Sequence, residues 1–354
     1  MPRWIDRTVH ALSGTTFRLI LLIAGFFVLW GMLAPVTTII WWLNQTAESL
    51  GLENNEEEKP DVLLQPSTNA PTTKIDCYIV FLAGVGNFSP DEITSGEKYF
   101  IDRLAERHPN CVVVRDVFPY SVVNRDLSQD LLAPLWQASK ETNGILSNVL
   151  VQVRNLWRFA ISADDRYGPV YNLSIAYTIV DRMNAAYPIA QADKPINLIL
   201  ISTSGGTQVA LGTTEHLRDW IPKARIVNVS IGGTFEGRAG FNHANHVYHL
   251  YGNQDWVQTL PRVVFPARWR FVVGSPVNQA RRQGRYTVCN VGDREHTGSK
   301  GYFGDAIPSV SFANAPNGIP YVKQTIEQVD RLPIWSIDQP LTSRCPVQKT
   351  PEQQ

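Results

Sequence analysis

Residues 196–210 read Ile-Asn-Leu-Ile-Leu-Ile-Ser-Thr-Ser-Gly-Gly-Thr-Gln-Val-Ala, and this stretch decides the fold. Its first half is an almost unbroken apolar run, which is typical of a strand buried on both faces of a parallel sheet. Its second half turns abruptly to small and polar residues and then regains a helical apolar spacing. Ser204 lies at the corner, so we expect its hydroxyl to project above the sheet edge. The next amide should lie at a helix N-terminus, where free N–H groups can hold an anion.

Strand and helix patterns alternate along residues 74–332, and a strand, helix and strand at this spacing imply a right-handed crossover and a mostly parallel sheet. Apolar runs predict strands at 77–82, 111–117, 196–202, 225–231, 246–251 and 285–291. Helical periodicity predicts flanking helices at 97–107, 171–187 and 320–332. The sequence therefore predicts an α/β domain over residues 74–332.

Residues of about 121–170 interrupt this alternation as a helical insertion, with helices expected at 131–138 and 145–161. Amphipathic spacing in the second of these helices is typical of a layer packed on the sheet. A lid over a site, or a face that touches a bilayer, is the other interpretation of the same pattern.

The N-terminal part of the chain has the composition of a membrane anchor. Residues 1–18 are short and basic, and residues 19–43 contain no charged side chain. At about 1.5 Å per residue the second segment can cross a hydrocarbon core of about 30 Å. A cleaved signal peptide or a buried globular helix would be shorter or less uniformly apolar. The preceding arginines predict a cytoplasmic N-terminus and an extracytoplasmic domain. Residues 44–73, acidic and then proline-rich, are typical of a flexible linker, and residues 333–354 form a tail.

Charge and cysteine content narrow the function classes. Lys plus Arg and Asp plus Glu both number 32, so no overall positive field favours nucleic acid. The four cysteines include no C-x-x-C pair, so the sequence contains neither the cysteine spacing of a zinc site nor that of a thioredoxin-like redox motif. Cys77 and Cys111 begin strands joined by one crossover, so we predict that they form a disulfide, and we also predict Cys289–Cys345. Four reduced thiols are the alternative.

Three polar residues follow the carboxyl ends of predicted strands, where ligands bind in open α/β sheets. Ser204 lies in the turn Ser202-Thr203-Ser204-Gly205-Gly206, which resembles the G-x-S-x-G nucleophile elbow with serine at the first position. Asp255 follows the strand 246–251, and His296 follows the last strand. The chain order Ser, Asp, His, together with this elbow, resembles the α/β-hydrolase superfamily from about residue 74 to residue 332. A small-residue turn of any doubly wound protein is the alternative for the Ser204 stretch.

The resemblance implies an α/β-hydrolase fold and a catalytic triad. Ser204 would be the nucleophile, His296 its base, and Asp255 the group that orients the imidazole. The amide of Gly205 would stabilise the oxyanion. The second oxyanion donor would come from the loop after the first strand, at Val85 or Gly84, where Ala83 replaces a histidine frequent in the family.

Three histidines, two acidic residues and an arginine-rich segment are further site candidates. His243, His246 and His249 cluster in sequence, but spacing on a strand turns the last two to opposite faces, so we expect no metal site. Asp293 and Glu295 are close to His296 in sequence, which makes either a poor substitute for Asp255. Arginines interleave with apolar residues between 261 and 285, a pattern typical of a solvated face or of a surface that touches anionic lipid headgroups.

These features together predict a membrane-anchored serine hydrolase that cleaves a carboxylic ester, with a lipid-like substrate favoured by the anchor. We expect no cofactor and no nucleic-acid partner. The expected partners are the small-molecule ester and the membrane, and the oligomeric state is open. One alternative is a thioesterase, amidase or peptidase with the same triad. The other is a catalytically silent α/β-hydrolase scaffold used for binding.

Overall fold

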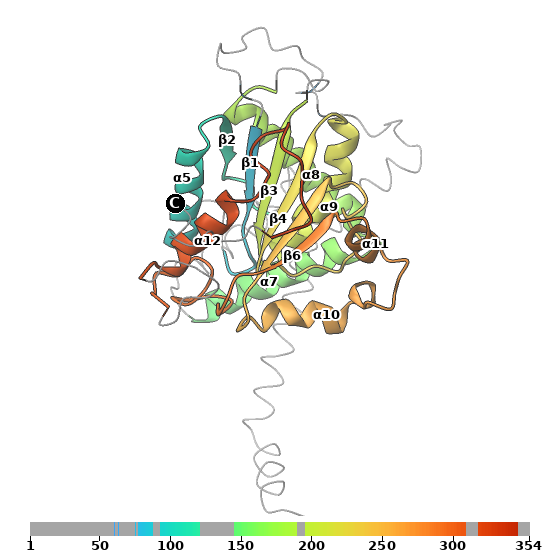
Figure 1. Cartoon of the computed structure of the whole chain (residues 1–354). Helices are drawn as coiled ribbons and strands as arrows, with labels where there is room; N and C mark the ends of the chain where they lie inside the picture. The colour runs from blue at the N-terminus through green and yellow to red at the C-terminus, as the bar shows by residue number, and fades with distance from the viewer. Residues whose placement is uncertain are drawn as a thin grey trace, which may run out of the picture. The chain divides into compact units, whose positions relative to one another are not determined.

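The computed structural model describes residues 60, 63, 75, 77–87, 93–120, 145–189, 195–308 and 318–345. The chain divides into two compact units, one of residues 1–54 with 124–158 and one of residues 55–123 with 159–354. The second unit contains the whole sheet and is described below (Figure 1). The predicted anchor at 19–43, the linker at 44–73 apart from isolated positions, and the predicted helix at 131–138 lie outside the described residues.

Six parallel strands form one sheet in the spatial order β2-β1-β3-β4-β5-β6. Their chain order matches the six predicted strands, and β2 alone is clearly shorter than predicted. The strands are β1 (Cys77–Leu82), β2 (Cys111–Val114), β3 (Asn197–Thr203), β4 (Arg225–Ile231), β5 (His246–Tyr251) and β6 (Tyr286–Asn290). The prediction of a mostly parallel sheet is confirmed.

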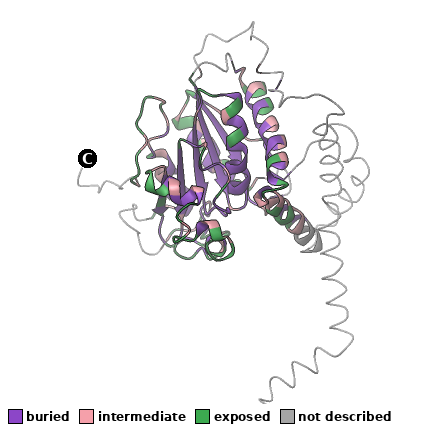
Figure 2. Ribbon diagram, turned by 90° about the vertical axis from the view of Figure 1, so that its right-hand side faces the viewer, coloured by how far each residue is buried: buried purple, intermediate pink, exposed green. Residues whose placement is uncertain are grey.

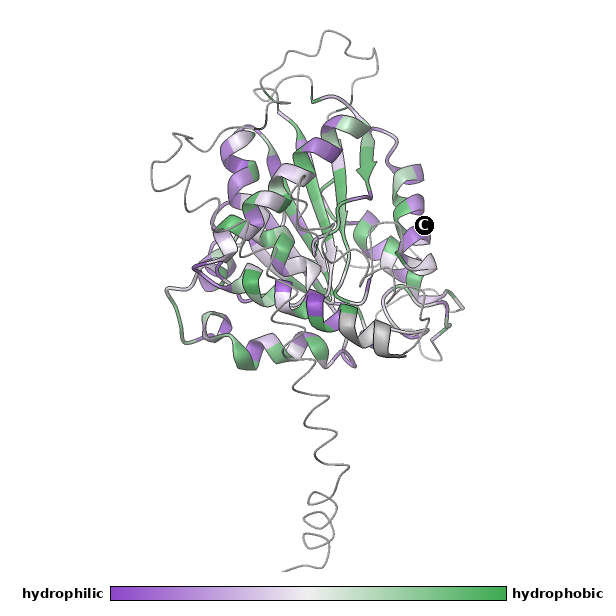
Figure 3. Cartoon of the chain, turned by 180° about the vertical axis from the view of Figure 1, so that it is seen from behind, coloured by the Kyte–Doolittle hydropathy of each residue, from purple (hydrophilic) through white to green (hydrophobic). Residues whose placement is uncertain are grey.

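Helices cover both faces of the sheet (Figures 1 and 3). On one face, α5 (Ser95–Arg107) contacts α12 (Tyr321–Asp330); on the other, α8 (Gly168–Ala186) contacts α9 (Gly206–Trp220). The strands between these layers are buried almost throughout (Figure 2), which explains why the predicted strands are continuous apolar runs rather than alternating ones.

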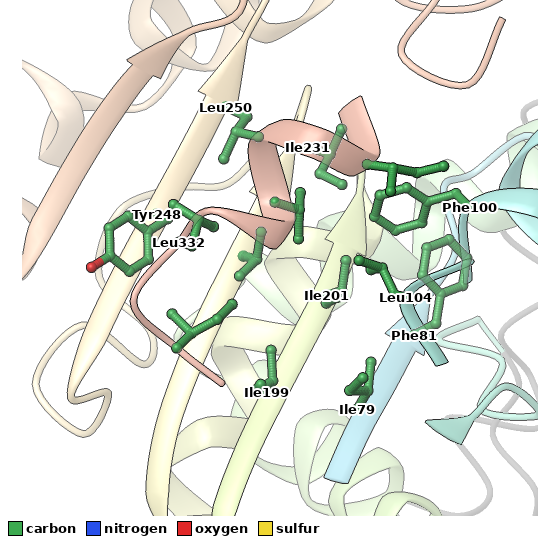
Figure 4. Packing of buried hydrophobic residues seen from close by; sticks show 14 of the residues in the cluster. Ile79, Phe81, Phe100, Leu104, Ile199, Ile201, Ile231, Tyr248, Leu250 and Leu332 are labelled. Atoms are coloured by element: carbon green, nitrogen blue, oxygen red, sulfur yellow. The ribbon is translucent and has the colours of Figure 1, made fainter. Parts of the chain in front are cut away.

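The core between the sheet and the α5–α12 layer is formed by residues that alternate along the strands. Ile79 and Phe81 of β1, and Ile199 and Ile201 of β3, face Phe100 and its neighbours on α5 (Figure 4). Two-residue spacing directs these side chains to one face of the sheet. The helix α5 begins at a capping box in which Thr94 and Glu97 each satisfy the other's backbone amide.

Both predicted disulfides are present. Cys77 pairs in register with Cys111 across β1 and β2, and their Cα atoms are 4.3 Å apart. Cys289 of β6 is bonded to Cys345, with Cα atoms 5.6 Å apart, which fastens the C-terminal segment to the edge of the sheet.

The strand order defines where a ligand should bind. After β1 the chain moves to β2 on one side, whereas after β3 it moves to β4 on the other side. Neighbouring strands whose connections leave in opposite directions open a crevice between their carboxyl ends. The loop after β1 and the turn after β3, which carry Val85 and Ser204, border this crevice.

Two parts of the chain differ from a simple alternation. The predicted helix at 145–161 is present as α7 (Ile145–Ala163). Between β5 and β6, where the sequence indicated only an arginine-rich surface, the chain forms short helical turns: η3 (Val257–Thr259), α10 (Leu260–Val264), η4 (Pro266–Arg268) and α11 (Pro276–Arg282). Among the described residues, no helix is both long and apolar enough to span a bilayer.

Candidate active site

Ser204 occupies a strained turn between β3 and α9. Its φ of 47° makes it the single non-glycine residue with positive φ in the described part of the chain. Such a conformation is uncommon for a residue with a side chain and is typically held by its surroundings at functional sites. The surroundings here are tight: a Cβ on Gly206 would lie 2.4 Å from the carbonyl oxygen of Ala83, and one on Gly205 would lie 2.8 Å from Cγ1 of Val85. The small residues that the sequence places beside Ser204 are therefore required by sterics.

The structure brings Ser204, His296 and Asp255 into one hydrogen-bonded chain. Nε2 of His296 lies 3.0 Å from Oγ of Ser204, and Nδ1 lies 2.9 and 3.0 Å from the two carboxylate oxygens of Asp255. An ionised carboxylate only accepts, so Nδ1 carries the proton and Nε2 is left to accept the serine proton. In sequence, Asp255 lies 41 positions and Ser204 lies 92 positions from His296, so only the fold brings the three residues together.

Asp255 is held in place by donors from its own turn and from a distant tyrosine. Its Oδ1 accepts hydrogen bonds from the amides of Val257 at 3.0 Å and Gln258 at 3.3 Å. Its Oδ2 accepts one from the hydroxyl of Tyr302 at 2.7 Å. The side chain of Asp255 is completely buried, whereas that of His296 is 15% exposed. The carboxylate is thus satisfied internally, and the imidazole remains reachable.

Tyr302 is a site residue that the sequence did not indicate. Its hydroxyl donates to Asp255 and accepts a hydrogen bond from the amide of Gly252 at 2.8 Å. Burial raises the pKa of Tyr302 far above its ordinary value, and the adjacent Asp255 carboxylate raises it further. The phenol therefore stays protonated and remains a donor. No local motif predicts this contact, because Tyr302 reaches Asp255 across 47 positions of sequence.

The turn that carries His296 is tied to the domain on both sides. The amide of Glu295 donates to the carbonyl of Lys300 at 3.1 Å, and Gly301 closes the turn through a hydrogen bond to Gly298. The preceding Arg294 is fully buried and donates to the carbonyl of Val291. Burial lowers the pKa of Arg294 to about 10. These contacts fix the backbone that presents the imidazole.

The loop after β1 lies beside the serine turn, as predicted. A Cβ on Gly84 would lie 2.9 Å from Cβ of Ser204, so the two backbones approach closely at this position. Asn87 at the end of this loop donates to the buried Glu97 of α5 at 3.2 Å, which anchors the loop to the capping box. In the described part of the chain the amide of Gly205 has no protein acceptor. Gly205 and Val85 are thus neighbours beside the Ser204 hydroxyl.

Tyr120 is a second residue of this site that the sequence did not indicate. Its hydroxyl lies 3.0 Å from the position of a Cβ on Gly205, and it is buried without a partner among the described residues. Burial raises its pKa well above the ordinary value, so the hydroxyl is a protonated donor. A buried hydroxyl without a partner is costly, which makes this group a candidate for contact with a substrate.

The histidines of β5 lie in structural hydrogen bonds. Nδ1 of His249 lies 2.9 Å from Oγ of Ser230, and Nε2 of His246 lies 2.8 Å from Oγ1 of Thr287. Over the described residues there is no group of three histidine, cysteine or acidic side chains arranged to hold a metal ion.

The two acidic neighbours of His296 in sequence are directed elsewhere. Asp293 accepts a hydrogen bond from the side chain of Asn253 at 3.1 Å, and Glu295 pairs with Lys300 at 3.9 Å. The carboxylate that contacts the imidazole is therefore that of Asp255.

No protein-family model matches this chain, and no curated protein matches it either. The chemistry of the site is therefore argued from its own geometry.

Proposed function

We propose that this protein is a serine hydrolase of the α/β-hydrolase superfamily that cleaves a carboxylic ester through an acyl-serine intermediate. The observation that carries the proposal is the hydrogen-bonded chain from Ser204 through His296 to Asp255, built on a serine with positive φ at a strand-to-helix turn. The position of this chain of residues at the switch point of the sheet supports the same conclusion.

In the proposed first step, Oγ of Ser204 attacks the ester carbonyl carbon while Nε2 of His296 takes the hydroxyl proton. The negative charge on the carbonyl oxygen is stabilised by the amide of Gly205, with the amide of Val85 as second donor and the hydroxyl of Tyr120 beside them. His296 then gives its proton to the leaving alcohol, and the acyl group stays on Ser204. Asp255 stabilises the imidazolium throughout.

In the second step, His296 removes a proton from water, and the resulting hydroxide equivalent attacks the acyl carbon. Collapse of the second tetrahedral intermediate returns the proton from His296 to Oγ of Ser204 and releases the carboxylic acid. The two steps together consume the ester and one water molecule, and they release the alcohol and the carboxylic acid with the triad regenerated.

The decisive experiment is labelling of the full chain with a fluorophosphonate, which reacts with an activated serine. We expect the wild-type protein to label, Ser204→Ala to lose labelling, and Ser174→Ala on α8 to label normally. The Ser174 control removes a half-buried serine hydroxyl away from the site. Labelling that survives in Ser204→Ala would overturn the assignment of the nucleophile.

A substrate panel then separates the alternatives. Turnover of esters above the Ser204→Ala background supports the proposal, whereas turnover of thioesters, amides or peptides alone assigns the triad to another acyl hydrolase. Absence of both labelling and turnover would favour a silent binding scaffold.

We also propose that residues 19–43 anchor this domain to a membrane, with the domain outside the cytoplasm. The uncharged apolar run and the arginines that precede it support this proposal. Protease added to vesicles of known sidedness should digest the domain in outward-facing preparations, and protection there would contradict the orientation.

A further inference from the structure

A second concave site lies at the opposite edge of the sheet from β1 and β2. It has a volume of about 780 Å³ and is bordered by β6, by the turns between β5 and β6, and by the C-terminal segment at Ser343 and Cys345. The disulfide between Cys289 and Cys345 holds that last wall against β6. None of Ser204, His296 and Asp255 lines this cavity.

Four arginines line this cavity, and we call it the arginine pocket: Arg262 of α10, Arg268 of η4, Arg270 of the turn that follows η4, and Arg281 of α11. Throughout the described residues none of the four is paired with a carboxylate, and the cavity lining contains no acidic side chain. Other arginines of this domain do form ion pairs, such as Arg107 with Glu327 and Asp330. The positive charge of the pocket is therefore uncompensated by its own walls.

Arg268 is the most informative of the four because it is only 8% exposed. Its guanidinium lies 4.0 Å from the centroid of the Phe235 ring and donates to the carbonyl of Phe235 at 3.2 Å. Burial lowers its pKa, the nearby Tyr286 opposes this effect, and Arg262 and Arg281 lower the pKa further. A buried cation beside two like charges is destabilising unless an anion compensates it.

Two of the other arginines, Arg262 and Arg281, lie over aromatic rings, which keeps their donors oriented. Arg262 lies over Tyr251 with 5.5 Å between the guanidinium carbon and the ring centroid, and Arg281 lies over Tyr286 at 5.4 Å. Asn278 also accepts a hydrogen bond from Arg281 at 2.7 Å. A planar guanidinium fixed in this way suits the bidentate recognition of phosphoryl oxygens.

We propose that the arginine pocket binds a ligand that carries a phosphoryl group. The same chemistry is presented by a soluble phosphorylated compound and by the headgroup of an anionic phospholipid. Exposed apolar side chains beside the pocket, Phe271 at 75% and Val273 at 56%, would contact acyl chains in the second case.

The test uses the full chain in a neutral detergent and measures binding by titration calorimetry. The probes are inorganic phosphate, monomeric dihexanoyl phosphatidic acid, and dihexanoyl phosphatidylcholine as the zwitterionic lipid, each against chloride at equal ionic strength. We expect the first or second probe to bind, with affinity falling about tenfold or more in the double variant Arg262→Gln, Arg281→Gln because charge-assisted hydrogen bonds are lost. Both arginines are exposed, so their loss should leave the fold intact.

Matched variants make the result decisive. Arg282→Gln removes an exposed charge from the same helix α11 but not from the pocket, and it should bind as wild type does. Arg262→Lys, Arg281→Lys keeps the charge and should bind with intermediate affinity. Ser204→Ala should bind normally, which separates this proposal from the proposed hydrolase activity.

Two outcomes support the phosphoryl-binding site and distinguish the two kinds of ligand. Equal affinity for phosphate and phosphatidic acid indicates a soluble phosphorylated ligand, and much tighter binding of phosphatidic acid indicates a lipid headgroup. The proposal is overturned if neither probe binds better than chloride, if phosphatidylcholine binds as tightly as phosphatidic acid, or if Arg282→Gln weakens binding as much as the double variant.

Discussion

Asp255 and Arg268 are both buried charges in the segment that follows β5, but their surroundings are opposite in kind. The carboxylate of Asp255 accepts hydrogen bonds from two backbone amides and Tyr302, and it contacts the ring of His296. The guanidinium of Arg268 has a neutral carbonyl and aromatic rings around it, with further arginines nearby.

The difference separates a buried charge that the fold satisfies from one that has no anionic partner among the described residues. A buried charge needs partners because its desolvation is otherwise uncompensated. Asp255 has those partners within the chain, so its orientation relative to His296 is set before any substrate arrives. Arg268 lacks an anionic partner among the described residues, which suits a binding site better than an internal support.

The largest effect on activity is expected from Asp255→Asn, which alters the buried carboxylate that the fold satisfies. An asparagine supports the wrong tautomer of His296, and we expect a loss of ester turnover on the order of 10⁴, as known for a serine protease triad. The measurement is kcat on the best ester of the panel. The control is Asp293→Asn, which removes an exposed carboxylate that contacts Asn253 rather than the imidazole. Equal losses in both variants would contradict the role of Asp255.

Replacement of Cys289 and Cys345 by serine should lower the free energy of unfolding by about 2–4 kcal/mol, since the bridge closes a long loop. It should also weaken phosphoryl binding, because Cys345 lines the arginine pocket. The matched control replaces Cys77 and Cys111, whose bridge joins β1 and β2 at the other edge of the sheet. That variant should lose stability but keep its affinity, and chemical denaturation with calorimetry checks both. An equal loss of phosphoryl affinity in the two double-cysteine variants would contradict the assignment of Cys345 to the wall of the arginine pocket.

The unfolding free energy should fall as the pH drops from about 6.5 to 4. Burial and, to a smaller extent, the nearby Arg285 together lower the pKa of His246 from its ordinary 6.5 to about 4. Between these values the unfolded chain binds a proton that the folded chain does not, so acid favours unfolding by roughly 3 kcal/mol.

The matching variants for this pH dependence are His246→Gln and Thr287→Val. The first removes the titrating ring and should flatten the stability profile between pH 4 and 6.5. The second removes only the hydrogen-bond partner of His246, so its profile should keep the wild-type slope. A profile of His246→Gln as steep as that of the wild type would contradict this origin.

Tyr302→Phe should produce a smaller effect at the same carboxylate. It removes one hydrogen bond to Asp255 and leaves the amide of Gly252 without its acceptor. We expect about 1.5–3 kcal/mol lower stability and reduced kcat, because hydrogen bonds to charged groups lie in this range. The control is Tyr248→Phe, whose hydroxyl donates to Thr342 away from the triad and should leave kcat unchanged. An unchanged kcat in Tyr302→Phe would limit Tyr302 to a structural role.

The smallest change in stability is expected from Arg268→Met. Replacement of a buried charge by an apolar side chain of similar length is often neutral or stabilising, so we expect a change within about 1 kcal/mol. Phosphoryl binding should nevertheless be lost. Strong destabilisation together with intact binding would show that Arg268 is a structural group and would remove the contrast with Asp255.

Much of the fold was predictable from local patterns. Apolar runs such as 196–202 predicted buried strands, and the six strands and the α5, α8 and α12 helices were found where periodicity indicated them. The strand-to-helix turn at Ser204 was also predictable, because a buried apolar run is followed there by small residues and then by helical spacing. The turns between β5 and β6 were missed, since three- to seven-residue helical segments are too short to show a periodic pattern.

The sequence by itself determined where the candidate catalytic residues and the first two cysteines lie relative to the strands. Ser204, Asp255 and His296 each follow a predicted strand, and Cys77 and Cys111 each begin one. Only the tertiary structure decided which groups meet. Tyr302 reaches Asp255, Tyr120 reaches Gly205, and four arginines converge on one cavity without an acidic partner among the described residues. The physical reason for this division is the sequence separation of the interacting groups. Strand and helix patterns arise from neighbours along the chain, whereas the partners of a buried charge are set by packing between segments far apart in sequence.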